Sequence, residues 1–202
     1  MTPFKVIIVL GKSGSGKGTQ AEMLAKEHSF KIISSGSLLR ARAEQNDFVG
    51  KGIAEILDRG GLIPTPIIFH LWLHELENAR EANLPAQTGS GVSGIIFEGS
   101  PRKLYEAYLL QEALEFYQLA GNMQVLHLDI LDAEALKRLL ARGRHDDKEN
   151  QIRERLRWYK DEVMPAVLYY KEKGNLIEIN GEQPVEEVYR EITEKLKDFL
   201  GK

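Results

Sequence analysis

The sequence contains no cysteine among its 202 residues, and this absence excludes disulfide bonds, thiolate zinc sites and a cysteine nucleophile. Long hydrophobic runs are missing as well. The first apolar run, Val6 to Leu10, has five residues, too few for a signal-peptide core or a membrane span, so we expect a cytoplasmic protein that does not bind membranes. An excess of positive charge is also lacking, because 27 Lys and Arg stand against 30 Asp and Glu. We therefore expect no nucleic-acid partner.

What is present is the composition of one globular domain, with 43% hydrophobic and 28% charged residues. Short apolar runs alternate with longer segments of helical spacing. The pattern predicts strands over residues 4–10, 31–33, 94–98, 123–129 and 176–179. It predicts helices over residues 16–28, 38–43, 53–57, 67–76, 103–119, 133–141, 149–172 and 185–199. This alternation indicates an α/β fold with a mostly parallel, five-stranded sheet flanked by helices. The Gly/Ser-rich segment at residues 85–94 is expected to be a surface loop without a function.

The most informative segment is the glycine-rich stretch between the first strand and the first helix, residues 11–19 (GKSGSGKGT). Glycines allow successive backbone N–H groups to converge on phosphate oxygens, and the following helix adds its positive N-terminal end. Lys17 supplies a positive charge for the outer phosphates, and a nearby hydroxyl can orient magnesium. Gly18 stands where the strict pattern has Ser or Thr, and Thr19 follows it. This Gly-Lys-Gly-Thr variant is the one associated with nucleoside monophosphate kinases.

Beyond this loop the chain resembles the adenylate kinase family over nearly its whole length. The similar segments are residues 14–20 (GSGKGTQ), 33–40 (ISSGSLLR), 61–63 (GLI) and 98–102 (EGSPR), with six charged residues: Arg138, Arg142, Arg144, Asp146, Asp147 and Arg155. The resemblance implies a P-loop NTPase fold spanning residues 1–202. It also implies an inserted nucleoside-monophosphate lobe at about 34–63 and a very short lid at about 142–148. The lid has one histidine, His145, and with no cysteine it cannot hold structural zinc.

The family's functional residues carry over to matching positions of this chain. ATP would be bound by Gly14, Ser15, Gly16, Lys17, Gly18, Thr19, Arg138 and Arg142, with Arg138 stacked on the adenine. The monophosphate would be bound by Ser35, Arg40, Gly61, Leu62, Ile63, Gly99, Arg102, Glu106, Arg144 and Arg155. Lys17, Arg142, Arg144 and Arg155 would be catalytic. Magnesium would be held by the ATP phosphates and waters, with Thr19 and Glu98 as candidate ligands.

Ser13 and Gln183 replace a proline and a lysine that are common in the family, and four further positions depart from its pattern near the metal and the acceptor. Ser37 and Glu98 replace aspartates that hold waters around magnesium, Ser100 replaces a phenylalanine, and Glu106 replaces a glutamine that reads the adenine. A carboxylate only accepts hydrogen bonds, so Glu106 suits the two N–H donors of guanine better than adenine. Alternatively, Glu106 points to solvent or reaches adenine through a water.

The arginines also carry an argument of their own. Arg138 and Arg142 are four residues apart on one helical face, and with Arg144 and Arg155 they form a cluster that would repel itself unless anions bind. We therefore expect a monomeric, magnesium-dependent kinase that transfers phosphate from ATP to AMP. The acceptor could instead be GMP, UMP or CMP, and a different class, a GTPase-like switch or a non-catalytic nucleotide-binding module, stays open.

Overall fold

The computed structural model describes residues 4–81, 92–144 and 147–201. Its five strands are β1 (Lys5–Gly11), β2 (Phe30–Ser34), β3 (Gly94–Glu98), β4 (Met123–Asp129) and β5 (Leu176–Asn180). The helices of the first half are α1 (Lys17–His28), α2 (Ser35–Ala43), α3 (Phe48–Asp58) and α4 (Thr65–Glu81). Those of the second half are α5 (Leu104–Phe116), the short 3₁₀ helix η1 (Ala120–Asn122), α6 (Asp132–Arg142), α7 (Glu149–Trp158), α8 (Met164–Glu172), α9 (Val185–Lys195) and α10 (Lys197–Leu200).

The strands form one parallel sheet in the order β2-β3-β1-β4-β5, which confirms the fold expected from the sequence. The first strand therefore lies at the centre, between β3 and β4. Val6 is opposite Ile95 of β3 on one side and Met123 of β4 on the other. Strand β1 reads as an uninterrupted apolar run because both of its faces are covered by helices.

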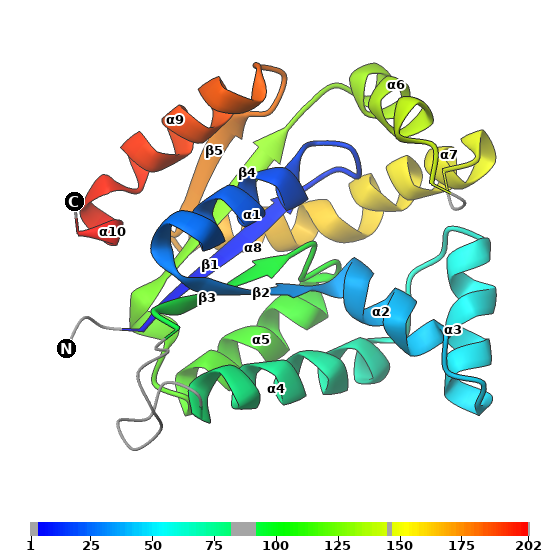
Figure 1. Ribbon diagram of the computed structural model, residues 1–202, viewed down its shortest axis with the longest axis horizontal. Coiled ribbons are helices and arrows are strands. Elements are labelled where there is room, and N and C mark those ends of the chain that lie inside the picture. Colours follow the sequence, from blue (N-terminus) through cyan, green and yellow to red (C-terminus); the bar gives the residue numbers. More distant parts are fainter. Residues whose placement is uncertain (1–3, 82–91, 145–146, 202) are drawn as a thin grey trace.

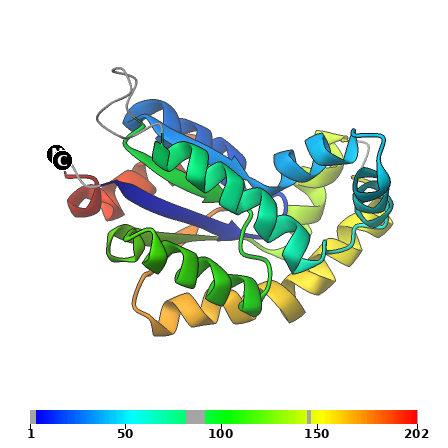
Figure 2. The same ribbon diagram turned by 90° about the horizontal axis from the view of Figure 1, so that it is seen from below.

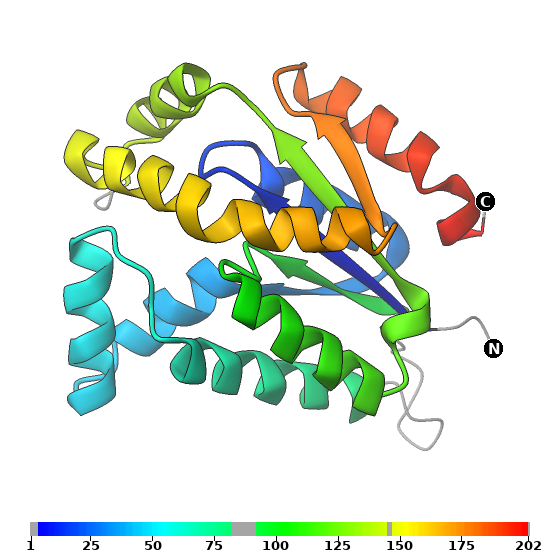
Figure 3. The same cartoon turned by 180° about the vertical axis from the view of Figure 1, so that it is seen from behind.

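Alternate residues of β1 enter two different core layers, as the two-residue period of a strand requires. Val6, Ile8 and Leu10 pack with the layer that contains α4, α5 and α8, whereas Ile7 and Val9 pack with the layer of α1 and α9. Figures 1 and 3 show the two helical layers on opposite sides of the sheet, and Figure 2 shows α4, α5 and α8 from below. Among the described residues, no helix is long and apolar enough to cross a membrane.

Two helix pairs lie beyond the carboxyl ends of the strands, where ligands bind in parallel α/β sheets (Figure 1). One pair is α2 and α3. The other is α6 and α7, which share a small apolar cluster that includes Leu139 and Ile152. The sequence places the proposed lobe and lid in these two regions. His145 and Asp146 of the expected lid, and most of the Gly/Ser-rich segment at 85–94, lie outside the described residues.

The helix boundaries differ from the sequence expectation where caps and turns decide them. Helix α3 begins at Phe48, five residues before the expected start, because the Asp47 carboxylate accepts a hydrogen bond from the Gly50 N–H at 2.8 Å. The helix expected over 149–172 is interrupted by a π-helical turn at Tyr159–Val163. The apolar period predicted one helix because such a turn inserts only one residue and leaves the chain helical on both sides.

Candidate active site

The phosphate loop joins the central strand to α1, and its glycines allow a tight path. Gly14 has a φ of +86°, and a Cβ atom there would lie 3.0 Å from the carbonyl oxygen of Ala135 in α6. Only glycine therefore lets the loop approach α6 this closely. Helix α1 begins at Lys17, so its first N–H groups point at the same place as the loop.

Lys17 is buried at the floor of this site, with 9% of its surface exposed. Its Nζ atom donates a hydrogen bond to the carbonyl oxygen of Lys12 at 2.6 Å. Burial lowers the pKa of Lys17 to about 8, and the nearby Glu98 carboxylate opposes that shift. A buried cation that donates a hydrogen bond to a neutral carbonyl oxygen is well placed to bind an anion.

A cavity of about 420 Å³ opens above the phosphate loop and collects most of the residues predicted for the site. From the phosphate loop and α1, it is lined by Gly14, Gly16, Lys17, Gly18 and Thr19. The other predicted residues in its lining are Arg40, Gly61, Glu98, Arg102, Arg138, Arg142, Arg144 and Arg155. The six arginines of this lining come from segments far apart in the sequence, so the fold brings them together with Lys17 in one cavity.

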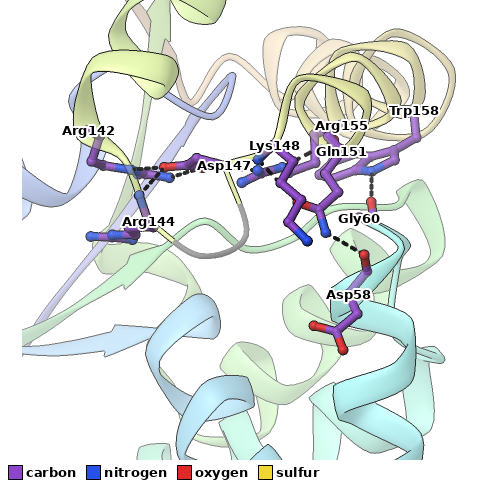
Figure 4. A network of polar contacts seen from close by, with 9 residues as sticks. All are labelled: Asp58, Gly60, Arg142, Arg144, Asp147, Lys148, Gln151, Arg155 and Trp158. Atoms are coloured by element: carbon purple, nitrogen blue, oxygen red, sulfur yellow. Dashed lines mark hydrogen bonds and ion pairs between the residues drawn. The ribbon is translucent and has the colours of Figure 1, made fainter.

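Asp147 explains how Arg142 and Arg155 can lie together (Figure 4). Its side chain is completely buried. It accepts two hydrogen bonds from Arg142, both at 2.8 Å, and one from Arg155 Nη2 at 3.0 Å. Burial by itself would raise the pKa of Asp147, but the bonds and charges of both arginines outweigh it and hold the pKa below its ordinary value. The expectation that the cluster needs bound anions is therefore wrong in part, because the chain supplies one carboxylate itself.

Two more of the cavity arginines, Arg138 and Arg102, are held by backbone and side-chain oxygens. Arg138 donates to Glu134 at 2.8 Å and to the carbonyl oxygen of Gly181 at 2.9 Å. Arg102 donates from Nε to the Gly99 carbonyl oxygen at 2.9 Å. These contacts fix the direction of each guanidinium group toward the cavity before a ligand arrives, which favours binding.

Six residues predicted for the site are not among those that line the cavity: Ser15, Ser35, Leu62, Ile63, Gly99 and Glu106. Ser35 is buried, where it hydrogen-bonds to Ser100 and accepts from Trp72 Nε1 at 3.0 Å. Ser100, which replaces a phenylalanine of the family pattern, is fully buried in the same contact. Ile63 is a core residue.

Glu106 does not point to solvent, since only 2% of its surface is exposed, and that alternative is wrong. Its carboxylate accepts from the backbone N–H of Arg102 at 2.7 Å, and the Thr65 hydroxyl lies 3.4 Å away. Burial raises the pKa of Glu106, although the Arg102 N–H and charge oppose the shift. The hydrogen bond to the Arg102 N–H has a local cause, because Glu106 is in the first turn of α5, where an acidic side chain can reach back to a free N–H group.

Sequence reasoning missed Trp158, which lines the cavity beside Arg102 and Arg155. The available signal was its position three residues after Arg155 on the same helix, which places both on one face. It also missed Ser34, whose hydroxyl donates to Glu98 at 2.7 Å and orients that carboxylate.

The oxygen atoms around the phosphate loop fit magnesium but do not form a separate metal cage. Thr19 is exposed and Glu98 is half-buried, and both belong to the cavity lining. Among residues 4–81, 92–144 and 147–201 there is no group of three or more His, Asp or Glu side chains able to hold a metal ion. Magnesium needs no such cage, because it usually takes most of its ligands from phosphates and waters.

Comparison with known proteins places this site in a family. The adenylate kinase family model matches residues 9–175. Adenylate kinase 1 of Nostoc sp. is 37% identical over 195 residues, which are 96% of this chain and 98% of that protein. The adenylate kinase of Corynebacterium urealyticum is 35% identical, covering 90% of this chain and 93% of the relative, and adenylate kinase 1 of Synechocystis sp. is 34% identical, covering 98% and 100%. The chain therefore belongs to the adenylate kinase family and is a nucleoside monophosphate kinase.

Proposed function

We propose that this kinase transfers the γ-phosphoryl group of ATP to AMP in a magnesium-dependent reaction that yields two molecules of ADP. The observation that carries the proposal is the cavity that joins Lys17 to arginines from α2, α6, α7 and the segment after β3. A site with so many fixed cations suits a nucleoside triphosphate and a nucleoside monophosphate whose phosphates meet end to end. The names of the relatives, all adenylate kinases, support AMP as the acceptor.

The chemistry needs positioned charge rather than a base. The acceptor phosphate oxygen is already anionic, so no proton has to be removed before it attacks the γ-phosphorus. Catalysis then consists of alignment and of neutralising charge on the transferring group. Lys17 would hold the donor phosphates, Arg40 and Arg102 the acceptor phosphate, and Arg142, Arg144 and Arg155 the transferring group. Guanidinium groups suit this role because they stay charged and offer two parallel donors.

Thr19 and Glu98, both in the cavity lining, would help the donor phosphates and waters to hold magnesium. When bound, it would neutralise phosphate charge during transfer. The Ser34 hydroxyl, 2.7 Å from Glu98, would keep the carboxylate oriented. Glu98 would thereby act in place of the shorter aspartate that the family has at this position.

The proposal includes two moving parts, the lobe at about 34–63 and the lid at about 142–148. Their closure would exclude water, which otherwise competes with the acceptor for the phosphoryl group. It also includes a monomer that works in the cytoplasm, in nucleotide biosynthesis, without a nucleic-acid or membrane partner. Light scattering of the purified chain tests the monomer.

The decisive experiment is a coupled assay of ADP formation with ATP and a panel of acceptors: AMP, GMP, UMP and CMP. We expect AMP to give the highest kcat/KM, and EDTA to abolish turnover. A preference for GMP would assign the carboxylate of Glu106 to guanine. Binding of ATP without acceptor-dependent turnover would contradict the proposal and favour a nucleotide-binding module.

A further inference from the structure

Trp158 occupies the last position of α7, directly before the π-helical turn at Tyr159–Val163. The two neighbouring aromatic residues have different surroundings. Tyr159 is buried and its hydroxyl lies 2.8 Å from His127 Nε2, whereas Trp158 is half-buried and lines the cavity. A π-helical turn changes which residues face a given side of a helix, and such turns are frequent at functional sites.

The indole N–H of Trp158 holds the connection between α3 and α4. Nε1 donates to the carbonyl oxygen of Gly60 at 2.8 Å. Gln151, about two turns earlier in the same helix, donates to the carbonyl oxygen of Asp58 (Figure 4). Gly60 has a φ of +70°, and a Cβ atom there would lie 3.0 Å from the Gln151 carbonyl oxygen. The glycine thus allows the two segments to touch. Gly60 and Gly61 both line the cavity, so this contact fixes one of its walls.

The ring face of Trp158 holds Arg102. The guanidinium carbon lies 5.6 Å from the ring centroid, within the range of a cation–π interaction. The Nε edge of the same guanidinium group is bonded to Gly99 at 2.9 Å. Arg102 is therefore held along one edge and on one face.

We propose that Trp158 is a positioning residue for the monophosphate site: its N–H fixes the Gly60–Gly61 wall while its ring fixes the guanidinium group of Arg102. The proposal rests on the proposed function, which assigns Gly61 and Arg102 to the acceptor. It adds one tryptophan that acts on both sides of that acceptor. Neither contact involves the phosphate loop, so the effect is specific to the monophosphate and leaves ATP binding unchanged.

Two variants separate the contacts of the ring from those of the N–H group. Trp158→Phe keeps an aromatic face for Arg102 and loses the bond to Gly60, whereas Trp158→Leu loses both. We expect Trp158→Phe to raise the KM for AMP about threefold to tenfold, the effect of one lost hydrogen bond, and Trp158→Leu to raise it further. The KM for ATP stays within about twofold. Titration calorimetry with AMP alone should show the same order of weakening in Kd. Arg157→Gln is the matched control, because Arg157 is exposed and pairs with Glu154 on the outside of the same helix.

A merely structural role predicts a different pattern. It would lower the melting temperature and the active fraction, and would leave both KM values unchanged. The proposal is overturned if Trp158→Leu changes neither KM, or changes the two equally. Coupling to Arg102 is tested by a double-mutant cycle with Arg102→Lys, whose cost should be smaller in Trp158→Leu than in the wild type. Additive costs would remove Arg102 from the proposal. If the wild-type chain phosphorylated no monophosphate, the proposed function would fail, and that failure is separate from any result on Trp158.

Discussion

The ammonium group of Lys17 lies 2.6 Å from the backbone carbonyl oxygen of Lys12, within one phosphate loop. The side chain of Lys12 turns away from that loop and anchors it. Its Nζ atom bonds to the carbonyl oxygen of Ile130 and lies 3.1 Å from the carboxylate of Asp132, at the start of α6. The carbonyl that orients Lys17 is therefore fixed by a second lysine, and α6, which carries Arg138 and Arg142, is tied to the same loop.

Lys17→Met should lower kcat on the order of 10²–10³-fold, because it removes the positive charge proposed to hold the donor phosphates. The fold should persist, since methionine has a side chain of similar length and places no charge in this buried position. Steady-state kinetics and a melting curve of the same preparation provide the measurement. A kcat within about threefold of the wild type would remove Lys17 from the mechanism.

Lys12→Met should raise the KM for ATP several-fold and lower the free energy of unfolding by about 1–2 kcal/mol. The methionine lacks the largely buried ammonium group that bonds to the Ile130 carbonyl oxygen and pairs with Asp132. The control is Lys160→Met. Lys160 pairs with the other oxygen of Asp132 at 2.8 Å but is 64% exposed, so its loss should destabilise the fold less than the loss of Lys12. Equal effects of the two variants on the KM for ATP would contradict the anchoring role of Lys12.

Asp147→Asn should lower both stability and turnover. The amide cannot balance two guanidinium groups, and removing one partner from a buried ion pair leaves charge uncompensated. We expect a loss of about 1–3 kcal/mol in the free energy of unfolding, less than for a fully buried pair because Arg142 is 35% exposed. Chemical denaturation measures it. Glu149→Gln is the control, since Glu149 pairs with an exposed arginine on the same helix. If both variants lost equal stability, Asp147 would not organise the lid. For the same reason Arg155→Ala is expected to lower the melting temperature as well as kcat.

Glu106→Gln should shift the preference between acceptors. The amide oxygen can still accept from the Arg102 N–H, so the turn at the start of α5 should persist. The amide also offers an N–H donor, which a carboxylate lacks, and this donor favours adenine over guanine. We expect the ratio of kcat/KM for AMP to that for GMP to rise about 5- to 150-fold. Glu115→Gln, an exposed change further along α5, serves as the control. An unchanged ratio would show that Glu106 acts only as a helix cap.

His127 should make stability depend on pH. It is 6% exposed, and burial lowers the pKa of its imidazole below the ordinary value of 6.5. The unfolded chain therefore binds the proton more readily, and the free energy of unfolding falls as the pH drops from about 6.5 through the lower pKa of the folded state. His127→Gln keeps a partner for Tyr159 without titrating. The melting temperature of the wild type should drop more than that of the variant between pH 7 and pH 5; parallel curves would contradict the argument.

The sequence by itself determined the fold class, the phosphate loop and the family. These rest on local patterns: an apolar run that ends in glycine, the lysine that begins the next helix, and short motifs at the ends of strands. It also placed Arg40, Arg102, Arg138, Arg142, Arg144 and Arg155 among the cavity residues, because each belongs to such a motif. The spacing of apolar residues predicted the strands and helices, but it did not predict the order of the strands, which depends on pairing between distant segments.

Only the tertiary structure decided which polar groups meet. Trp158 and Gly60 are 98 residues apart, and Ser35 and Ser100 are 65 apart, so no window of sequence contains either pair. Glu106 belongs to a recognisable motif, yet its second hydrogen-bond partner, the Thr65 hydroxyl, comes from another helix. The carboxylate of Asp147 lies close to Arg142 and Arg155 in the chain, but its complete burial comes from the packing of α6 against α7. Hydrogen bonds of this kind form only after the apolar faces have packed, because packing sets the distances between side chains that carry no periodic signal of their own.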